Sequence, residues 1–91
     1  MTPTQIELAR HALGLPNRNR VSYRNHYVTG QDAPEHREWC AMVDAGEARR
    51  GKPSQLTGGD DCFWLTAKGA ALALHAGEAL NREDFKAWAG A

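Results

Sequence analysis

Apolar side chains recur every three or four residues near the start of the chain, at Ile6, Ala9 and Leu13. This spacing predicts a helix over residues 3–13 with one apolar face. Thr2 and Gln5 have the spacing of a capping box at its beginning. A glycine followed two residues later by a proline (Gly14 to Pro16) then predicts its end, because proline cannot continue a helix.

A second apolar stripe lies at Trp39, Met42 and Val43 and predicts a helix over residues 33–45. Asp32 or Ala33 is its expected N-cap, and Gly46 is its expected end. The intervening segment, residues 17–30, begins with polar, turn-like residues and continues with β-branched and aromatic ones. We expect an irregular or strand-like segment there and not a helix.

The next pattern is that of a β-hairpin, which we call the wing. Its candidate strands are residues 47–51 and 62–65, and the loop between them contains Pro53, Gly58, Gly59 and two aspartates. A helix over 66–76 follows, with Thr66 as N-cap. Glycine costs roughly 1 kcal/mol of helix propensity relative to alanine, so Gly69 in the first turn indicates a close backbone approach. A last short helix is expected over 81–88, capped by Asn81.

Together these elements predict one α+β domain over residues 1–91, winged-helix-like, with three to four helices and one β-hairpin over 47–65. A chain of 91 residues forms a single domain with a modest core. The predicted core residues are Ile6, Leu13, Trp39, Met42, Val43, Phe63, Leu65 and Leu72.

Composition narrows the class of protein. Eleven basic and eleven acidic residues cancel, so the chain as a whole has no long-range attraction to nucleic acid or anionic membranes. No apolar run approaches the 18 or so residues of a membrane-spanning helix. The beginning of the sequence lacks the basic and apolar regions of a signal peptide. With only two cysteines, Cys40 and Cys62, we expect reduced thiols in a cytoplasm.

The charges are nevertheless unevenly distributed. Residues 1–30 carry four basic and one acidic residue, and residues 31–61 carry four basic and seven acidic ones. Arginine and lysine contact phosphates, so an alternative prediction is DNA binding. Its contacts would come from the segment near residue 20 and from the wing: Arg18, Arg20, Arg24, Arg49, Arg50 and Lys52. Two glutamates, Glu35 and Glu38, at the start of the expected reading helix disfavour it.

Metal binding and catalysis are both disfavoured. His36 and Cys40 lie four apart on one predicted helix face, and Cys62 could lie opposite them on the wing, but a structural zinc site needs a fourth ligand. Neither cysteine lies in a nucleophile motif, and no phosphate-binding loop is present. Gly58-Gly59-Asp60-Asp61 resembles the acidic turn of nucleotide cyclases, which need a much larger domain. We therefore expect no metal, no cofactor and no enzymatic activity.

Two resemblances add context. The run from Trp39 to Arg50, with Asp60 to Gly69, resembles the helix, wing and Leu-Thr-x-x-Gly helix start of MarR-type winged-helix proteins. The family's preceding helix of the helix-turn-helix has no counterpart here. Residues 11–70 also look like small uncharacterised proteins of tailed bacteriophages and prophages. That resemblance implies a phage-associated role in the bacterial cytoplasm and no catalytic residue.

The resulting hypothesis is a non-enzymatic phage or prophage accessory protein that binds another protein of the phage or the host. The apolar residues of helix 66–76 also suggest a homodimer through that helix. DNA binding and a role as a virion or assembly component remain alternatives.

Overall fold

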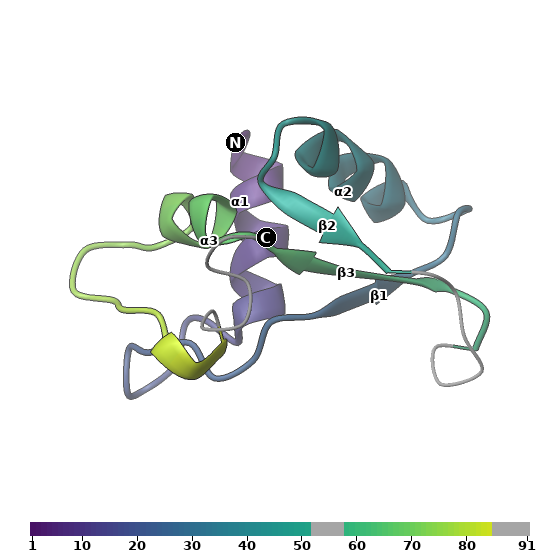
Figure 1. Ribbon diagram of the computed structural model, residues 1–91. Coiled ribbons are helices and arrows are strands. Elements are labelled where there is room, and N and C mark those ends of the chain that lie inside the picture. Colours follow the sequence, from purple (N-terminus) through teal and green to yellow (C-terminus); the bar gives the residue numbers. More distant parts are fainter. Residues whose placement is uncertain (52–57, 85–91) are drawn as a thin grey trace.

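The computed structural model describes residues 1–51 and 58–84. Its helices are α1 (Pro3–Leu13), α2 (Pro34–Asp44) and α3 (Ala67–Leu72), followed by a 3-10 helix at Arg82–Asp84. Its strands are β1 (Tyr27–Thr29), β2 (Ala48–Arg50) and β3 (Asp61–Leu65). The α+β class is therefore confirmed. In Figure 1, α1 stands behind the sheet, between α3 and α2.

The three strands form an antiparallel sheet in the order β1-β3-β2. Ala48 pairs with Leu65 and Arg50 with Phe63, which confirms the predicted pairing of the wing strands. On the other side of β3, Tyr27 pairs with Phe63 and Thr29 with Asp61. The segment expected to be irregular or strand-like thus supplies a third strand, and Val21 adds a single bridge to Ala79.

The predicted helix starts follow from local chemistry. The Thr2 and Gln5 side chains and backbones form the expected capping box of α1, and Gly14 ends this helix with φ of 79°. Of the two N-cap candidates for α2, Ala33 takes the position and makes no side-chain hydrogen bond. Thr66 caps α3 by accepting a hydrogen bond from the backbone of Gly69, as predicted.

The core lies between the inward face of the sheet and the helices. Trp39 of α2 stacks on Phe63 of β3 with 5.6 Å between ring centroids, and both side chains are fully buried. The buried apolar residues are Ala9, Ala12, Leu13, Leu15, Trp39, Met42, Ala48, Phe63, Leu65, Ala70 and Ala73. Five of the eight predicted core residues are among them.

The other three predictions need correction. Ile6 is only half-buried, and Val43 packs against the edge of the core. Leu72 is 48% exposed, because α3 turns Ala70 and Ala73 inward and leaves Leu72 on the opposite side. Helix α3 is also shorter than predicted: it ends at Leu72, not at Ala76, and Gly77 lies in the turn beyond.

A buried ion pair accounts for the early end of α3. Arg10 of α1 donates to the carbonyl of Ala73 (3.0 Å) and binds the Glu78 carboxylate with both terminal nitrogens. Glu78 in turn accepts from the backbone of His75. These hydrogen bonds hold the residues after Leu72 in a turn. Helix α3 therefore does not continue beyond Leu72. Of the last predicted helix, 81–88, residues 81–84 lie within the described residues, and Arg82–Asp84 forms a 3-10 helix. The Asn81 side chain accepts from the Glu83 backbone there.

Gly69 confirms the expected close approach. A Cβ at this position would overlap the carbonyl oxygen of Glu47 and would lie 2.8 Å from its carbonyl carbon. The same carbonyl oxygen accepts from the backbone of Thr66, so it cannot move away without losing that bond. Glycine therefore sets the distance between α3 and the start of the wing.

We predict that Gly69→Ala destabilises the fold by about 2 kcal/mol, because overpacking outweighs the gain in helix propensity. Urea unfolding measures this. Ala71→Gly, at an exposed position of the same helix, is the matched control and should cost roughly 1 kcal/mol through propensity alone. A neutral or stabilising Gly69→Ala would contradict the close approach.

The Arg10–Glu78 pair predicts a specific acid response. The hydrogen bonds from Arg10 lower the pKa of Glu78 from 4.5 to about 2. The folded chain thus binds this proton less readily than the unfolded chain, so the stabilisation is complete above pH 4.5 and is lost as the pH falls toward 2. Glu78→Gln should lower the free energy of unfolding at pH 7 and weaken its pH dependence in this range. Asp44→Asn, at an exposed carboxylate, should leave the pH dependence of the wild type intact.

Candidate functional site

Two of the three arginines near residue 20 are exposed to solvent, and the third is hydrogen-bonded to α1. Arg18 and Arg20 are exposed in the connection between α1 and β1. Arg24 instead returns to α1, where its Nε and Nη2 donate to the carbonyl of His11 (3.2 and 2.7 Å). A cation at the C-terminal end of a helix is stabilised by the helix dipole. Arg24 therefore has a structural role besides any binding role.

The wing cations lie at a different edge of the sheet. Arg49 and Arg50 are on β2, whereas Arg24 precedes β1, and β3 separates these two strands. Arg50 binds the buried carboxylate of Asp61, and Arg49 is exposed. Lys52 lies outside the described residues. The two sets of predicted DNA contacts are thus not brought together by the sheet.

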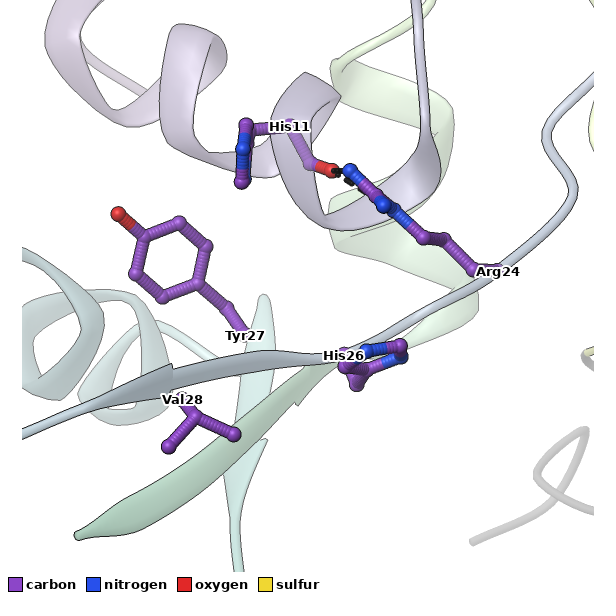
Figure 2. A pocket seen from close by; sticks show the side chains of 5 residues that line it. All are labelled: His11, Arg24, His26, Tyr27 and Val28. Atoms are coloured by element: carbon purple, nitrogen blue, oxygen red, sulfur yellow. Dashed lines mark hydrogen bonds between the residues drawn. The ribbon is translucent and has the colours of Figure 1, made fainter. Parts of the chain in front are cut away.

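A hollow of about 300 Å³ lies between α1 and β1 and is lined by His11, Arg24, His26, Tyr27 and Val28. We call it the β1 hollow. Figure 2 shows Tyr27 directed toward α1, Arg24 reaching the His11 carbonyl, and Val28 on the other side of the strand. The rings of His11 and Tyr27 meet edge to face at 5.3 Å. Beside it, the guanidinium of Arg24 lies 5.3 Å from the ring centroid of Tyr23.

The β1 hollow combines cationic and apolar character. Val28, which lines the hollow, is 42% exposed, and Tyr23, whose ring lies beside the Arg24 guanidinium, is 60% exposed. Burial, reinforced by the nearby Glu35 charge, raises the pKa of Tyr27, so its phenol is neutral at ordinary pH. Among the described residues, no carboxylate forms an ion pair with Arg24. The β1 hollow is therefore suited to a ligand that carries an anionic group next to apolar groups.

A second cluster joins α2 to the sheet. His36 Nε2 lies 2.7 Å from Asp61 Oδ2, and Arg50 Nη2 binds the same oxygen. On the other side of the imidazole, Nδ1 of His36 lies 3.5 Å from Sγ of Cys40. The His36 ring meets Phe63 edge to face at 5.4 Å, which fixes its orientation. Cys40, His36 and Asp61 thus form a continuous chain of contacts, which we call the thiol cluster.

Neighbouring groups keep the Asp61 carboxylate of this cluster ionised. The hydrogen bond from His36 and the guanidinium of Arg50 hold the pKa of Asp61 below its usual value of 3.8, although burial opposes them. The Asp61 side chain is only 1% exposed, and its Oδ1 has no hydrogen-bond partner among the described residues. An ionised, buried carboxylate is stable only when paired, so Asp61 depends on His36 and Arg50.

Sequence reasoning found only part of the thiol cluster. It placed His36 and Cys40 on one face of a helix, which the structure confirms, but proposed Cys62 as the opposite group. Cys62 lies on β3, where it pairs with Val28 of β1, and its thiol points to the carbonyl of Phe63. Asp61 was assigned to the wing loop. The alternation of Asp61, Phe63 and Leu65 could have shown that it faces inward with the core residues.

Within the described ranges, no group of three or more histidine, cysteine or acidic side chains is arranged to hold a metal ion. No helix in this part of the chain is long and apolar enough to cross a membrane. Comparison with models of protein families, with curated proteins and with solved structures gives no match in any of the three. The function therefore has to be argued from the two sites themselves.

The two neighbouring wing arginines allow a matched test of the thiol cluster. Arg50→Gln removes a cation from buried Asp61 and should cost about 1 kcal/mol, less than a fully buried charged hydrogen bond, because the Arg50 side chain is 42% exposed and solvent screens it. Arg49→Gln, on the exposed face, should change stability by less than about 0.5 kcal/mol. Equal effects in thermal unfolding would contradict the structural assignment of Arg50.

Proposed function

We propose that this chain is a protein-binding module whose β1 hollow receives an acidic, partly apolar segment of a partner protein. The observation that carries the proposal is that the β1 hollow is lined by exposed Val28 and by Arg24, a cation without a carboxylate partner among the described residues. Exposed Tyr23 lies beside the guanidinium of Arg24. Protein interfaces favour aromatic residues and arginine at their centres. An acidic side chain would bind Arg24, and its apolar neighbours would cover Tyr23 and Val28.

Local charge supports an acidic partner. Arg18 and Arg20 are exposed in the segment that leads to Arg24, and Arg10, the remaining basic residue of this region, is already neutralised by Glu78. The segment between α1 and β1 therefore carries positive charge although the chain is neutral overall. Such a local field speeds the approach of an oppositely charged surface.

The partner would bind through its side chains and not by adding a strand to β1. The backbone N–H of His26 already donates to Ala12, and the carbonyl of Gly30 accepts from Ala33. Strand addition needs a row of unpaired groups along an edge. The residues on either side of the three-residue strand use such groups internally, which leaves too short an edge.

DNA binding is less well supported as a function. Its predicted contacts lie at two edges of the sheet, and Arg50 is already paired with the Asp61 carboxylate. The order of helix, strand, helix and wing hairpin supports a winged-helix-like identity for the domain. The resemblance to tailed-phage proteins supports a phage partner or a host partner in the bacterial cytoplasm. A homodimer is a further alternative, for which Leu72 on the shortened α3 is exposed.

The proposal predicts that the double variant Tyr23→Ser/Val28→Ser loses partner binding while remaining folded. Each lost apolar contact costs roughly 1–2 kcal/mol, so affinity should fall at least tenfold. The immobilised protein would be exposed to nuclease-treated lysate of a bacterium carrying a tailed prophage, and the captured protein would be purified for titration calorimetry. Leu72→Ser, at a similarly exposed apolar residue outside the hollow, is the matched control.

Loss of affinity in the double variant alone supports the β1 hollow as the binding surface. Equal affinity of both variants would contradict it, as would loss only in Leu72→Ser, which would indicate α3. A mobility shift of duplex DNA at about 50 mM salt, with affinity falling as salt rises, would favour the DNA alternative.

A further inference from the structure

We infer that Cys40 is a nucleophilic thiol that accepts acyl groups from activated esters or thioesters, with His36 as its base and Asp61 as the residue that orients the base. This inference is independent of the β1 hollow and contradicts the sequence-based expectation of no catalytic chemistry. It rests on the arrangement of three side chains from two elements, and the structure shows each contact between them.

The contacts have the order that a thiol nucleophile requires. One ring nitrogen of His36 faces Sγ of Cys40 (3.5 Å), and the other faces a carboxylate oxygen of Asp61 (2.7 Å). A nucleophile, a base within hydrogen-bonding reach and a third group that orients the base define the recurring triad of acyl-transfer sites. Chain order and fold do not matter for this recognition, because the same geometry recurs on unrelated folds.

The carboxylate selects the useful tautomer of the imidazole. Asp61 is ionised, since its pKa lies below the usual value, and an ionised carboxylate only accepts hydrogen bonds. Nε2 of His36 must therefore carry a proton. In the neutral ring this leaves Nδ1 as the acceptor that faces the thiol.

Helix and sheet hold the cluster in place. His36 and Cys40 are four residues apart on α2 and so project from the same face. Asp61 is fixed by the pairing of β3 with β1 at Thr29 and by Arg50 of β2. The edge-to-face contact with Phe63 restrains the imidazole further. None of the three groups depends on a long loop for its position.

Solvent reaches this cluster. Cys40 is partly exposed, and the His36 side chain is 11% exposed. His36 also borders a hollow of about 330 Å³ between the β1–α2 connection and the start of α2, lined by Gln31, Asp32, Ala33, Pro34, His36, Arg37 and Glu38. Cys40 itself does not line this hollow, so a small acyl group would reach the thiol through the exposed part of Cys40.

The reaction is balanced without any further reactant. Sγ of Cys40 attacks the acyl carbon as Nδ1 of His36 removes the thiol proton, and Asp61 stabilises the imidazolium. The bond between acyl carbon and leaving oxygen or sulfur then breaks, and the imidazolium returns the proton to the leaving group. The products are a thioester on Cys40 and a free alcohol or thiol.

The test uses p-nitrophenyl acetate with the full chain. We expect one equivalent of p-nitrophenol per chain and an acetyl group on the Cys40 peptide, as determined by mass spectrometry. Cys62→Ser should retain this burst, and Cys40→Ser should lose it. His36→Gln should slow acetylation on the order of 100-fold, the loss expected for a general base. His75→Gln, at an exposed histidine, is the matched control and should react like the wild type.

Two results would overturn the inference. One is acetylation of Cys40 in the wild type no faster than that of Cys62 in the same molecule, a comparison that needs no variant to fold. The other is an unchanged acetylation rate in a folded His36→Gln protein. Asp61→Asn adds a test of positioning: it should lower the rate and change the pH profile of Cys40 acetylation, while the profile of Cys62 stays the same.

Discussion

The buried carboxylate of Asp61 is the interaction on which this fold depends most. It lies at the start of β3 and is bound by His36 from α2 and Arg50 from β2, while its backbone position is paired with Thr29 of β1. One side chain therefore connects a helix with the strands of the sheet. A buried charge is costly when a partner is removed, so the arrangement favours the single packing in which both His36 and Arg50 contact Asp61.

The position of α2 has consequences for both the core and the surface. Once His36 is held at the sheet, Trp39 reaches Phe63 and completes the centre of the core. The same helix turn places Cys40 beside the imidazole. At the other end of the molecule, Arg10 and Glu78 hold the chain after α3 against α1, and the connection leading to β1 leaves Tyr23 and Val28 exposed. Arg10–Glu78 and Arg50–Asp61 are therefore two separate ion pairs that hold different parts of the fold.

Local chemistry explains which parts of the fold could be predicted from the sequence. The capping residues Thr2, Gln5 and Thr66 act through neighbours three residues away, so their helices begin where expected. The cost of Gly69 indicated a close approach without showing to what. The end of α3 could not be predicted, because it depends on Arg10, more than sixty residues earlier. Leu72 is exposed because Ala70 and Ala73 are the residues of this segment that face the core. Asp61 was assigned to a loop because two glycines and a second aspartate precede it. Its partner His36 lies 25 residues away, a separation at which no local pattern operates.

We infer that Asp61 fixes His36 in one tautomer, in which Nε2 donates a hydrogen bond to the Asp61 carboxylate and Nδ1 accepts one from the Cys40 thiol. Long-range proton–nitrogen NMR of the ¹⁵N-labelled chain at neutral pH tests this most directly, because it distinguishes the two ring nitrogens of each histidine. We expect His36 to carry a proton on Nε2 that is protected from exchange with water, and none on Nδ1. A proton on Nδ1, or an Nε2 proton that exchanges as fast as that of the exposed His75, would contradict it.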